Sequence, residues 1–213
     1  MKKITMTLIT AIVLAGSIFA QESISSFPAK PAPKEFLEIG VGYGSITMIE
    51  TDSPKSKQEI GGLGLQIGHY EELAKILGFQ TNFFFSLPTS IEYTTGSRTV
   101  DLLDTTSISS PMMMNANFML MLSLPLGFLN IRAGAGISYT LYTQKKPELF
   151  NQFLAVPIEG DVIFKMGSDL YIKAGLDVEI VFKQWQHKGS KTTDLDGYDS
   201  YIVIPHLAAG ISF

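Results

Sequence analysis

Four carboxylates fall at alternating positions of two apolar segments that follow one another in the chain. Glu159 and Asp161 lie in the first segment, and Asp177 and Glu179 lie in the second. If residues 167–169 form a tight turn, the segments pair as a hairpin and Glu159 comes to lie near Asp177. Carboxylates this close resist joint ionisation unless bases, cations or water compensate them.

Further charged residues share this alternation and are expected nearer the turn: Lys165, Lys173, Arg132 and Glu38. We favour a network of ion pairs that fills a closed interior. A narrow pore that favours cations is the second interpretation, and conductance in planar bilayers would separate the two. Paired carboxylates also serve glycoside hydrolysis, but the sequence indicates no substrate cleft.

The three histidines do not form a metal or catalytic motif. His69, His187 and His206 lie on different segments without the ligand spacing of a zinc site. His206 could meet Ser138 only across an enclosed interior, and a hydrolase needs a serine, a histidine and an acid together. We therefore predict no enzyme activity, no catalytic residue, no metal site and no cofactor.

Two polar stretches are candidates for contact with other molecules. Residues 88–110 are rich in Ser and Thr, and long connections of this kind often carry recognition. Residues 184–197 form the second stretch. At its end, Asp194, Asp196 and Asp199 resemble part of a calcium loop but lack the terminal Glu, so we expect a solvated turn.

The segment that carries Asp177 and Glu179 alternates strictly between apolar and polar residues, as a β-strand does. One face is apolar throughout: Ile172, Ala174, Leu176, Val178, Ile180 and Phe182. The other face mixes charges with glycine: Lys173, Gly175, Asp177, Glu179 and Lys183. Glycines among charges are typical of a crowded small-barrel interior, so we expect the apolar face to point outward.

The same pattern recurs along the chain and predicts an all-β protein of eight antiparallel strands. Their expected ranges are 36–49, 59–69, 77–87, 111–124, 130–143, 151–165, 170–183 and 198–213. Short connections alternate with longer ones, as in an up-and-down transmembrane barrel. Residues 111–129 are uncharged and long enough for a membrane helix. Their polar residues Asn115, Asn117 and Ser123 share one side only on a strand, so we favour the strand.

The chain begins with Lys2 and Lys3, an apolar stretch and small residues up to Ala20, which is the pattern of a cleaved signal peptide over 1–20. Residues 21–35 form a Pro-rich periplasmic linker, and 36–213 form the barrel. The chain has no cysteine, so disulfides are excluded. Its formal charge of −4 without a basic patch argues against nucleic acid as a partner.

The final residues alternate up to an aromatic end, with Leu207, Ala209, Ile211 and Phe213 on one face. With the strand number, the loop asymmetry and the ending Leu-Ala-Ala-Gly-Ile-Ser-Phe, the chain resembles the small eight-stranded bacterial outer-membrane proteins. These include the OmpA transmembrane domain, OmpX and the OmpW-like group. The resemblance covers 36–213 and implies a Gram-negative outer-membrane location. It also implies that the terminal strand is the insertion signal for the barrel assembly machinery.

These observations lead to an integral outer-membrane barrel that is structural and exposes its loops for adhesion or contact. An extracellular partner through 88–110 and 184–197 is expected, in addition to the lipid bilayer. The first alternative is a narrow porin-like channel for cations or small solutes. The second alternative is a soluble periplasmic carrier with a calycin-like barrel, which would bury the apolar faces instead.

Overall fold

The computed structural model describes residues 34–52, 55–105 and 108–213. The expected signal peptide over 1–20 and residues 21–33 of the expected linker lie outside the described residues. The first strand, β1, begins at Glu35, the last residue assigned to that linker.

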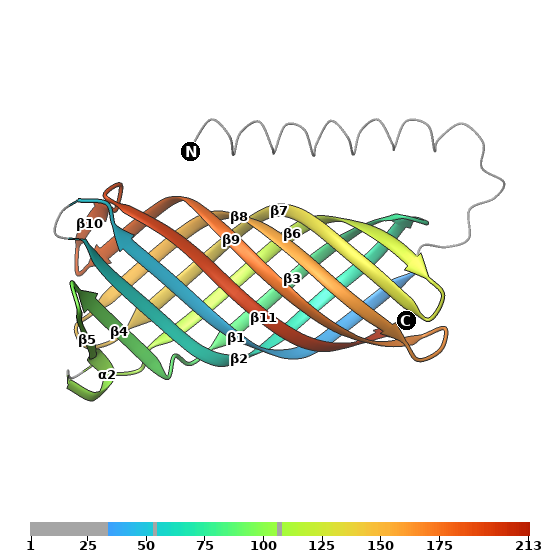
Figure 1. The fold of residues 1–213 in the computed structure, drawn as a ribbon, viewed down its shortest axis with the longest axis horizontal. Helices are drawn as coiled ribbons and strands as arrows, with labels where there is room; N and C mark the ends of the chain where they lie inside the picture. Colours follow the sequence, from blue (N-terminus) through green and yellow to red (C-terminus); the bar gives the residue numbers. More distant parts are fainter. Residues whose placement is uncertain (1–33, 53–54, 106–107) are drawn as a thin grey trace. The chain divides into compact units, whose positions relative to one another are not determined.

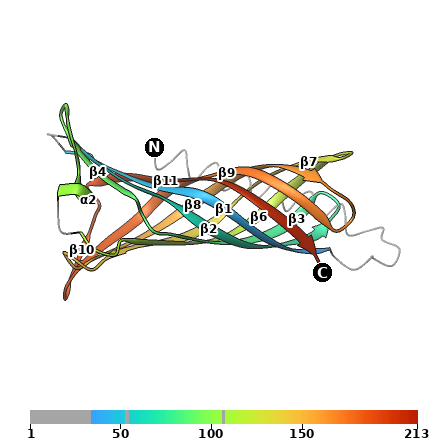
Figure 2. The ribbon, with the colours of Figure 1, turned by 90° about the horizontal axis from the view of Figure 1, so that it is seen from below.

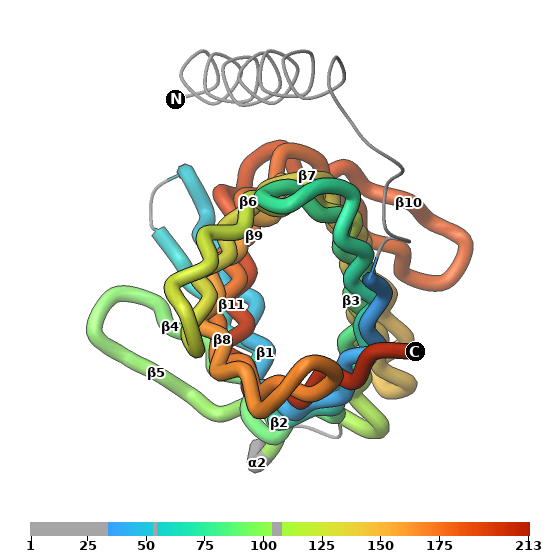
Figure 3. The backbone as a smooth tube through the Cα atoms, turned by 90° about the vertical axis from the view of Figure 1, so that its right-hand side faces the viewer, coloured from blue at the N-terminus to red at the C-terminus, as the bar shows by residue number. Residues whose placement is uncertain are grey.

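Eight long antiparallel strands form the wall of a closed barrel (Figure 1). They are β1 (Glu35–Glu50), β2 (Ser56–Ala74), β3 (Leu77–Ser86), β6 (Met112–Leu126), β7 (Leu129–Gln144), β8 (Leu149–Lys165), β9 (Leu170–Lys188) and β11 (Tyr198–Ser212). Each strand pairs with the next in this order, and β1 pairs with both β2 and β11, which closes the ring (Figure 3). The eight expected strands are confirmed, including the strand expected within 111–129. In the part of the chain that the structure describes, no helix is long and apolar enough to cross a membrane.

The long connections carry additional secondary structure that the sequence did not indicate. The expected loop over 88–110 contains β4 (Ser90–Thr95), β5 (Arg98–Asp101) and the short helix α2 (Leu102–Thr105). Because β3 ends at Ser86, the first residues of β2 pair with β4 instead. The strand β10 (Lys191–Asp194) folds back on β9. All of these lie at one end of the barrel, opposite the C-terminus (Figures 1 and 2).

The apolar faces of the strands point outward. Ile172, Leu176 and Ile180 of β9 are 39%, 46% and 41% exposed, whereas Asp177 and Glu179 on the other face are buried. A soluble barrel buries its apolar face, so this orientation is the one expected of a barrel solvated by lipid.

The alternation fails beyond Phe182. Leu154 of β8 pairs with Lys183 and the next residue pairs with Val181, so Phe182 bulges out of the ladder. One extra residue exchanges the two faces of a strand. Lys183, expected on the inward face, is therefore directed away from the interior, and Gln184 is buried in its place.

The aromatic side chains near the end of the barrel with the short turns (the short-turn end) divide between its two faces. Phe36 and Tyr171 are buried inside the barrel, with ring centroids 5.0 Å apart. Phe128 and Phe213 at the same end are strongly exposed.

Proline affects one of the strand ladders without shifting it. The pairing of β1 with β11 breaks off at Gly42–His206 and resumes at Ser45–Val203 in the same register. Pro205 lies in this gap and has no N–H to donate, which explains the interruption.

The interior of the barrel changes from polar to apolar along its length. Toward the end with the long connections, buried apolar side chains from most of the strands fill it: Ile46, Met48, Ile60, Phe84, Ile91, Met113, Tyr142, Phe153, Ile202 and Ile204. We call this set the apolar plug. Leu102 and Leu103 of α2 and Ile108 pack against it, so the connection after β5 covers the plug. The polar interior expected from the alternating charges therefore covers only part of the length of the barrel.

Candidate functional site inside the barrel

Glu38 of β1 is the acceptor at which three side chains meet. Lys173 Nζ lies 2.6 Å from Glu38 Oε2, and Arg132 Nη1 lies 3.2 Å from Oε1. The Tyr171 hydroxyl also donates to Oε1. These donors come from β7 and β9, so the cluster joins β1 to two strands that are not its neighbours in the wall.

Arg132 is held by aromatic rings as well as by Glu38. Its guanidinium carbon lies 3.4 Å from the ring centroid of Tyr70 and 5.0 Å from that of Tyr171. A buried guanidinium over aromatic faces gains cation–π stabilisation in addition to its ion pair. The group therefore blocks the interior near the short-turn end with a side chain that is fixed from several sides.

A second layer lies beside Lys173. Its Nζ is 3.2 Å from Glu159 Oε1 and 3.6 Å from Asp161 Oδ2. His206 Nε2 lies 3.1 Å from Asp161 Oδ1 and 3.6 Å from Glu159 Oε1. Gln80 Nε2 donates to Glu159 Oε1 at 2.7 Å. Both carboxylates of this layer thus have a lysine and a histidine as neighbours.

Gly175 makes room for this layer. A Cβ at Gly175 would collide with Asp161 Oδ1 and the His206 ring. The absence of a side chain on β9 therefore lets the carboxylate of β8 reach the imidazole of β11 over the strand between them. Close approach of this kind is a common reason for glycine inside a strand.

The third layer contains the remaining two carboxylates, and only neutral groups hold them. Asn117 donates to Asp177 Oδ2 through its amide nitrogen. Glu179 accepts from Asn115 Nδ2 at 2.7 Å and from Ser138 Oγ at 2.9 Å. Among the described residues, neither Asp177 nor Glu179 takes part in an ion pair.

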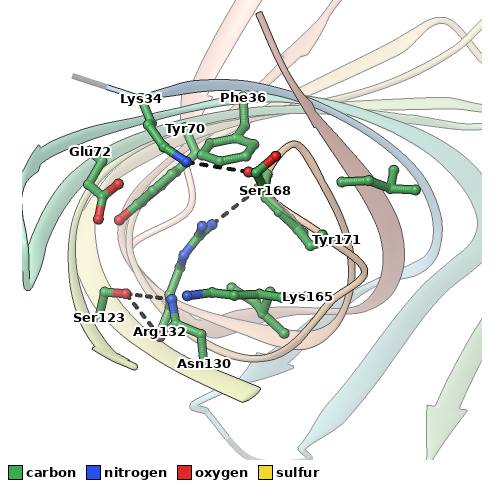
Figure 4. Close-up of a pocket in the computed structure, with 13 residues that line it drawn as sticks. Lys34, Phe36, Tyr70, Glu72, Ser123, Asn130, Arg132, Lys165, Ser168 and Tyr171 are labelled. Carbon is green, nitrogen blue, oxygen red and sulfur yellow. Dashed lines mark hydrogen bonds between the residues drawn. The ribbon is translucent and has the colours of Figure 1, made fainter. Parts of the chain in front are cut away.

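A pocket of about 360 Å³ opens at the short-turn end of the barrel. Arg132 points into it, and a Ser123–Asn130 pair with an O–N distance of 2.8 Å lies at its side (Figure 4). Lys165 and Lys34 line the pocket, and Lys34 Nζ donates to the Ser168 carbonyl at 3.4 Å. Arg132 and the rings of Tyr70 and Tyr171 form part of the lining of this pocket.

The structure brings most of the sequence-predicted charge cluster together. Glu38, Arg132, Glu159, Asp161, Lys173, Asp177 and Glu179 are all buried inside the barrel. Lys165 differs, because it is exposed at the mouth of the pocket. The register places Glu159 directly opposite Asp177, since the turn between β8 and β9 is short.

Several neutral partners were missed in the sequence. Gln80 and Asn82 of β3 bind Glu159, and their positions on the inward face of that strand were the available signal. Asn115 and Asn117 had been recognised as the polar side of a strand, but their carboxylate partners depend on contacts across the barrel. Those contacts cannot be read from one strand.

Glu159, Asp161 and His206 offer three metal-ligand atoms within 4.8 Å of one another. Sequence spacing could not show this group, because its members lie on β8 and β11. The ammonium of Lys173 already lies against both carboxylates, which opposes a metal ion at the same oxygens. At this group the distances would allow a metal ion, and the charge of Lys173 opposes it.

Ser138 and His206 have different partners in the structure. Ser138 Oγ donates to Glu179, and His206 bonds to Asp161 in another layer. The geometry therefore provides no serine–histidine hydrogen bond for nucleophilic catalysis. Of the three aspartates near the end of 184–197, Asp194 and Asp196 pair with Lys183 at the surface, and Asp199 pairs with Ile49 in the wall.

No protein-family model matches the chain, and no curated protein matches it either. Solved structures do. The outer membrane protein OprG from Pseudomonas aeruginosa superposes with a TM-score of 0.56 at 13% identity, covering 85% of this chain and 96% of that chain. This chain has the fold of the small outer-membrane β-barrels.

Two further structures agree. A major outer membrane protein from Thermus thermophilus gives a TM-score of 0.54 at 15% identity, covering 86% of this chain and all of that chain (100%). Neisserial surface protein A gives 0.50 at 9% identity, covering 82% and 97%. At these identities the likeness concerns the fold, and the function must be argued from the residues of this barrel itself.

Proposed function

We propose that this protein is an integral protein of the bacterial outer membrane with a closed interior, and that its outer hairpins make its contacts. The observation that carries the proposal is the filled interior. Arg132 with its two tyrosines, the carboxylate layers and the apolar plug follow one another along the barrel. An eight-stranded barrel is just wide enough for side chains to fill it.

The apolar faces of the strands, which point outward, support the membrane location. Lipid is needed to remove these faces from water, since no other part of the described chain covers them. The test is fractionation of cells that express the full chain. We expect the protein in carbonate-washed outer membranes, with a gel mobility that changes on heating. Recovery as a free periplasmic protein would contradict the proposal and favour the soluble carrier.

A cation-favouring channel is the rival function, and one observation favours it. Five buried carboxylates outnumber the two buried permanent cations, Arg132 and Lys173. An acidic interior attracts cations, but conduction also needs a continuous water path. The apolar plug interrupts such a path.

Planar-bilayer recordings separate the two functions. We expect no discrete conductance steps from the refolded protein in potassium chloride. The matched control is a variant that thins the plug, Phe84→Ala with Met113→Ala, measured at the same protein density. Steps from the unmodified protein, with selectivity for potassium over chloride, would establish the channel instead.

The outer hairpins are the surfaces through which we propose contact with an extracellular partner. The ends of β4 and β5 and all of β10 are exposed to solvent. They lie at the end of the barrel with the long connections, opposite the C-terminus (Figure 2). Rigid hairpins on a barrel are suited to recognition because the scaffold fixes their positions.

This contact role is tested by replacing the tip of each hairpin with a short Gly-Ser turn. Cells displaying the full chain should attach to an abiotic or cell surface better than cells displaying either replaced variant. Barrel assembly should stay unchanged, as judged by heat-dependent gel mobility. Equal attachment by all of these cells would remove the adhesion role and leave a structural one.

A further inference from the structure

The charges inside the barrel do not balance. Its buried carboxylates are Glu38, Glu159, Asp161, Asp177 and Glu179. Their buried counterparts are Arg132, Lys173 and, when protonated, His206. All ion pairs of these bases go to the first three acids. The uncompensated charge is therefore located at Asp177 and Glu179.

These two carboxylates lie two residues apart on the inward face of β9 and act on one another electrostatically. Amides and hydroxyls from β6 and β7 donate to them but carry no charge. Burying two ionised carboxylates without a cation is costly, because neutral donors replace only part of their hydration. A cation in this layer would offset that cost.

A void of about 10 Å³ lies next to Asp177. Four amides line it, and each has a side-chain oxygen without a hydrogen-bond donor: Gln66, Asn82, Asn115 and Asn117. Asp177 Oδ1 is likewise unpaired. The rest of the lining besides Asp177 is Glu159 and His206, which pair with one another, and the apolar Phe84 and Ile204. All of these side chains are at least nine-tenths buried. The void is about large enough for one ion or one water molecule.

We propose that the closed interior holds one calcium-class divalent cation in this void, bound by Asp177 and by the amide oxygens of Asn82, Asn117 and Gln66. Calcium binds six to eight oxygen ligands, and it accepts carboxylates together with amide carbonyls in an irregular shell. Glu179 does not line the void but follows Asp177 by two residues on the inward face of β9, so the second charge of a divalent ion offsets its charge from a greater distance. Magnesium fits less well because it requires near-ideal octahedral geometry.

The barrel wall and the plug imply that the ion enters while the chain folds, since the void has no open route through the apolar plug. The experiment therefore refolds the full chain from urea into detergent with a chelator, with calcium, or with magnesium. After desalting, bound metal is measured by mass spectrometry. We expect about one calcium per chain, and a thermal midpoint raised by about 5–10 °C at a hundredfold excess over Kd.

The double variant Asp177→Asn, Glu179→Gln should bind no calcium and should melt at the same temperature in all three conditions. In chelator it should be at least as stable as the unmodified chain, because the uncompensated acids are gone. Gln66→Met removes one neutral ligand without changing charge, and we expect a several-fold weaker affinity. This single variant keeps the test decisive if the double variant does not fold.

The matched control is Asp196→Asn with Glu148→Gln, which removes the same two charges from exposed outer segments. It should retain the bound calcium. Loss of the metal in this control would place the ion at the outer loop and overturn the internal site. Absence of bound calcium in the unmodified chain would overturn it as well, leaving a water molecule in the void. Metal content is measured independently of conductance, so this outcome does not depend on the proposed function.

Discussion

Lys173 Nζ lies 2.6 Å from Glu38 Oε2 and connects β9 to β1 past the strand that separates them, β11. The same ammonium also contacts Glu159 and Asp161. One buried lysine thus compensates three carboxylates from two other strands, β1 and β8. Its loss leaves Arg132 as the remaining ion-pair partner of Glu38, and His206 as the remaining base beside Glu159 and Asp161.

Lys173→Met should destabilise the barrel by about 3–5 kcal/mol, the cost of breaking a buried ion pair. Urea unfolding in lipid vesicles, followed by heat-dependent gel mobility, measures the effect. Lys165→Met is the control, because this lysine is exposed at the pocket mouth, and its effect should stay within about 0.5 kcal/mol. Equal effects of the two variants would contradict the described network.

Phe84 and Phe83 are adjacent residues with opposite environments. Phe84 is 2% exposed within the plug, whereas Phe83 is 49% exposed on the outer face. Phe84→Ala should cost about 3–5 kcal/mol, because it leaves a cavity among packed side chains. Phe83→Ala should cost clearly less, since lipid chains fill the space. A larger loss for Phe83→Ala in the same unfolding assay would show that the faces are reversed.

Leu176 tests which solvent the outer face meets. In a bilayer, Leu176→Arg should cost about 2–4 kcal/mol if the residue lies near the midplane. In water the same substitution at a 46% exposed position would be nearly neutral. The measurement compares unfolding in vesicles with that of Thr192→Arg, on the exposed strand β10. No difference between the two variants would argue against lipid contact.

Phe213 is 78% exposed and follows the outward residues Leu207 and Ile211. If this end is read by the assembly machinery, Phe213→Ala should lower the amount of folded barrel in cells. Refolding of the purified chain into detergent should be unchanged. Phe128→Ala changes another exposed aromatic at the same end, and it should assemble normally. Normal cellular assembly of Phe213→Ala would exclude the insertion-signal role.

Lys183 holds the hairpin of β9 and β10 through Asp194 and Asp196. The hydrogen bond to Asp194 raises the pKa of Lys183 above its usual range. A raised lysine pKa means that the pair stabilises the hairpin at neutral pH and is lost only as pH rises through that value. We therefore expect protection of 184–197 from proteolysis to be constant between about pH 6 and 9. Lys183→Met should remove it at every pH, and Lys188→Met should not.

The wall of this barrel is predictable where a strand alternates with a period of two, as β9 does from Ile172 to Phe182. The register of β8 with β9 could be predicted from the expected pairing of Glu159 with Asp177, because the short turn between the two strands allows few alternatives. The single-residue bulge at Phe182 was not predictable. No proline or glycine lies at the bulge. It is visible only in the pairing of Lys183 with Leu154 and of Val181 with Ala155 on the neighbouring strand.

The apolar plug was missed for a related reason. Ile46, Met48 and Ile202 make the inward faces of their strands apolar at this end of the barrel. The outward faces of the same strands also carry apolar residues. A segment that is apolar on both faces no longer shows which side is enclosed. The partners of Asp177 and Glu179 were hidden too, because Asn115, Asn117 and Ser138 come from strands elsewhere in the wall.

The pairing of Phe36 with Ser212 joins the first strand of the wall to the last. The seam cannot form until synthesis of β11 is complete. Until then the chain has two unpaired edges, which are templates for aggregation. The whole polypeptide must therefore be kept from collapsing until β11 is made, and the final strand determines when the ring can close.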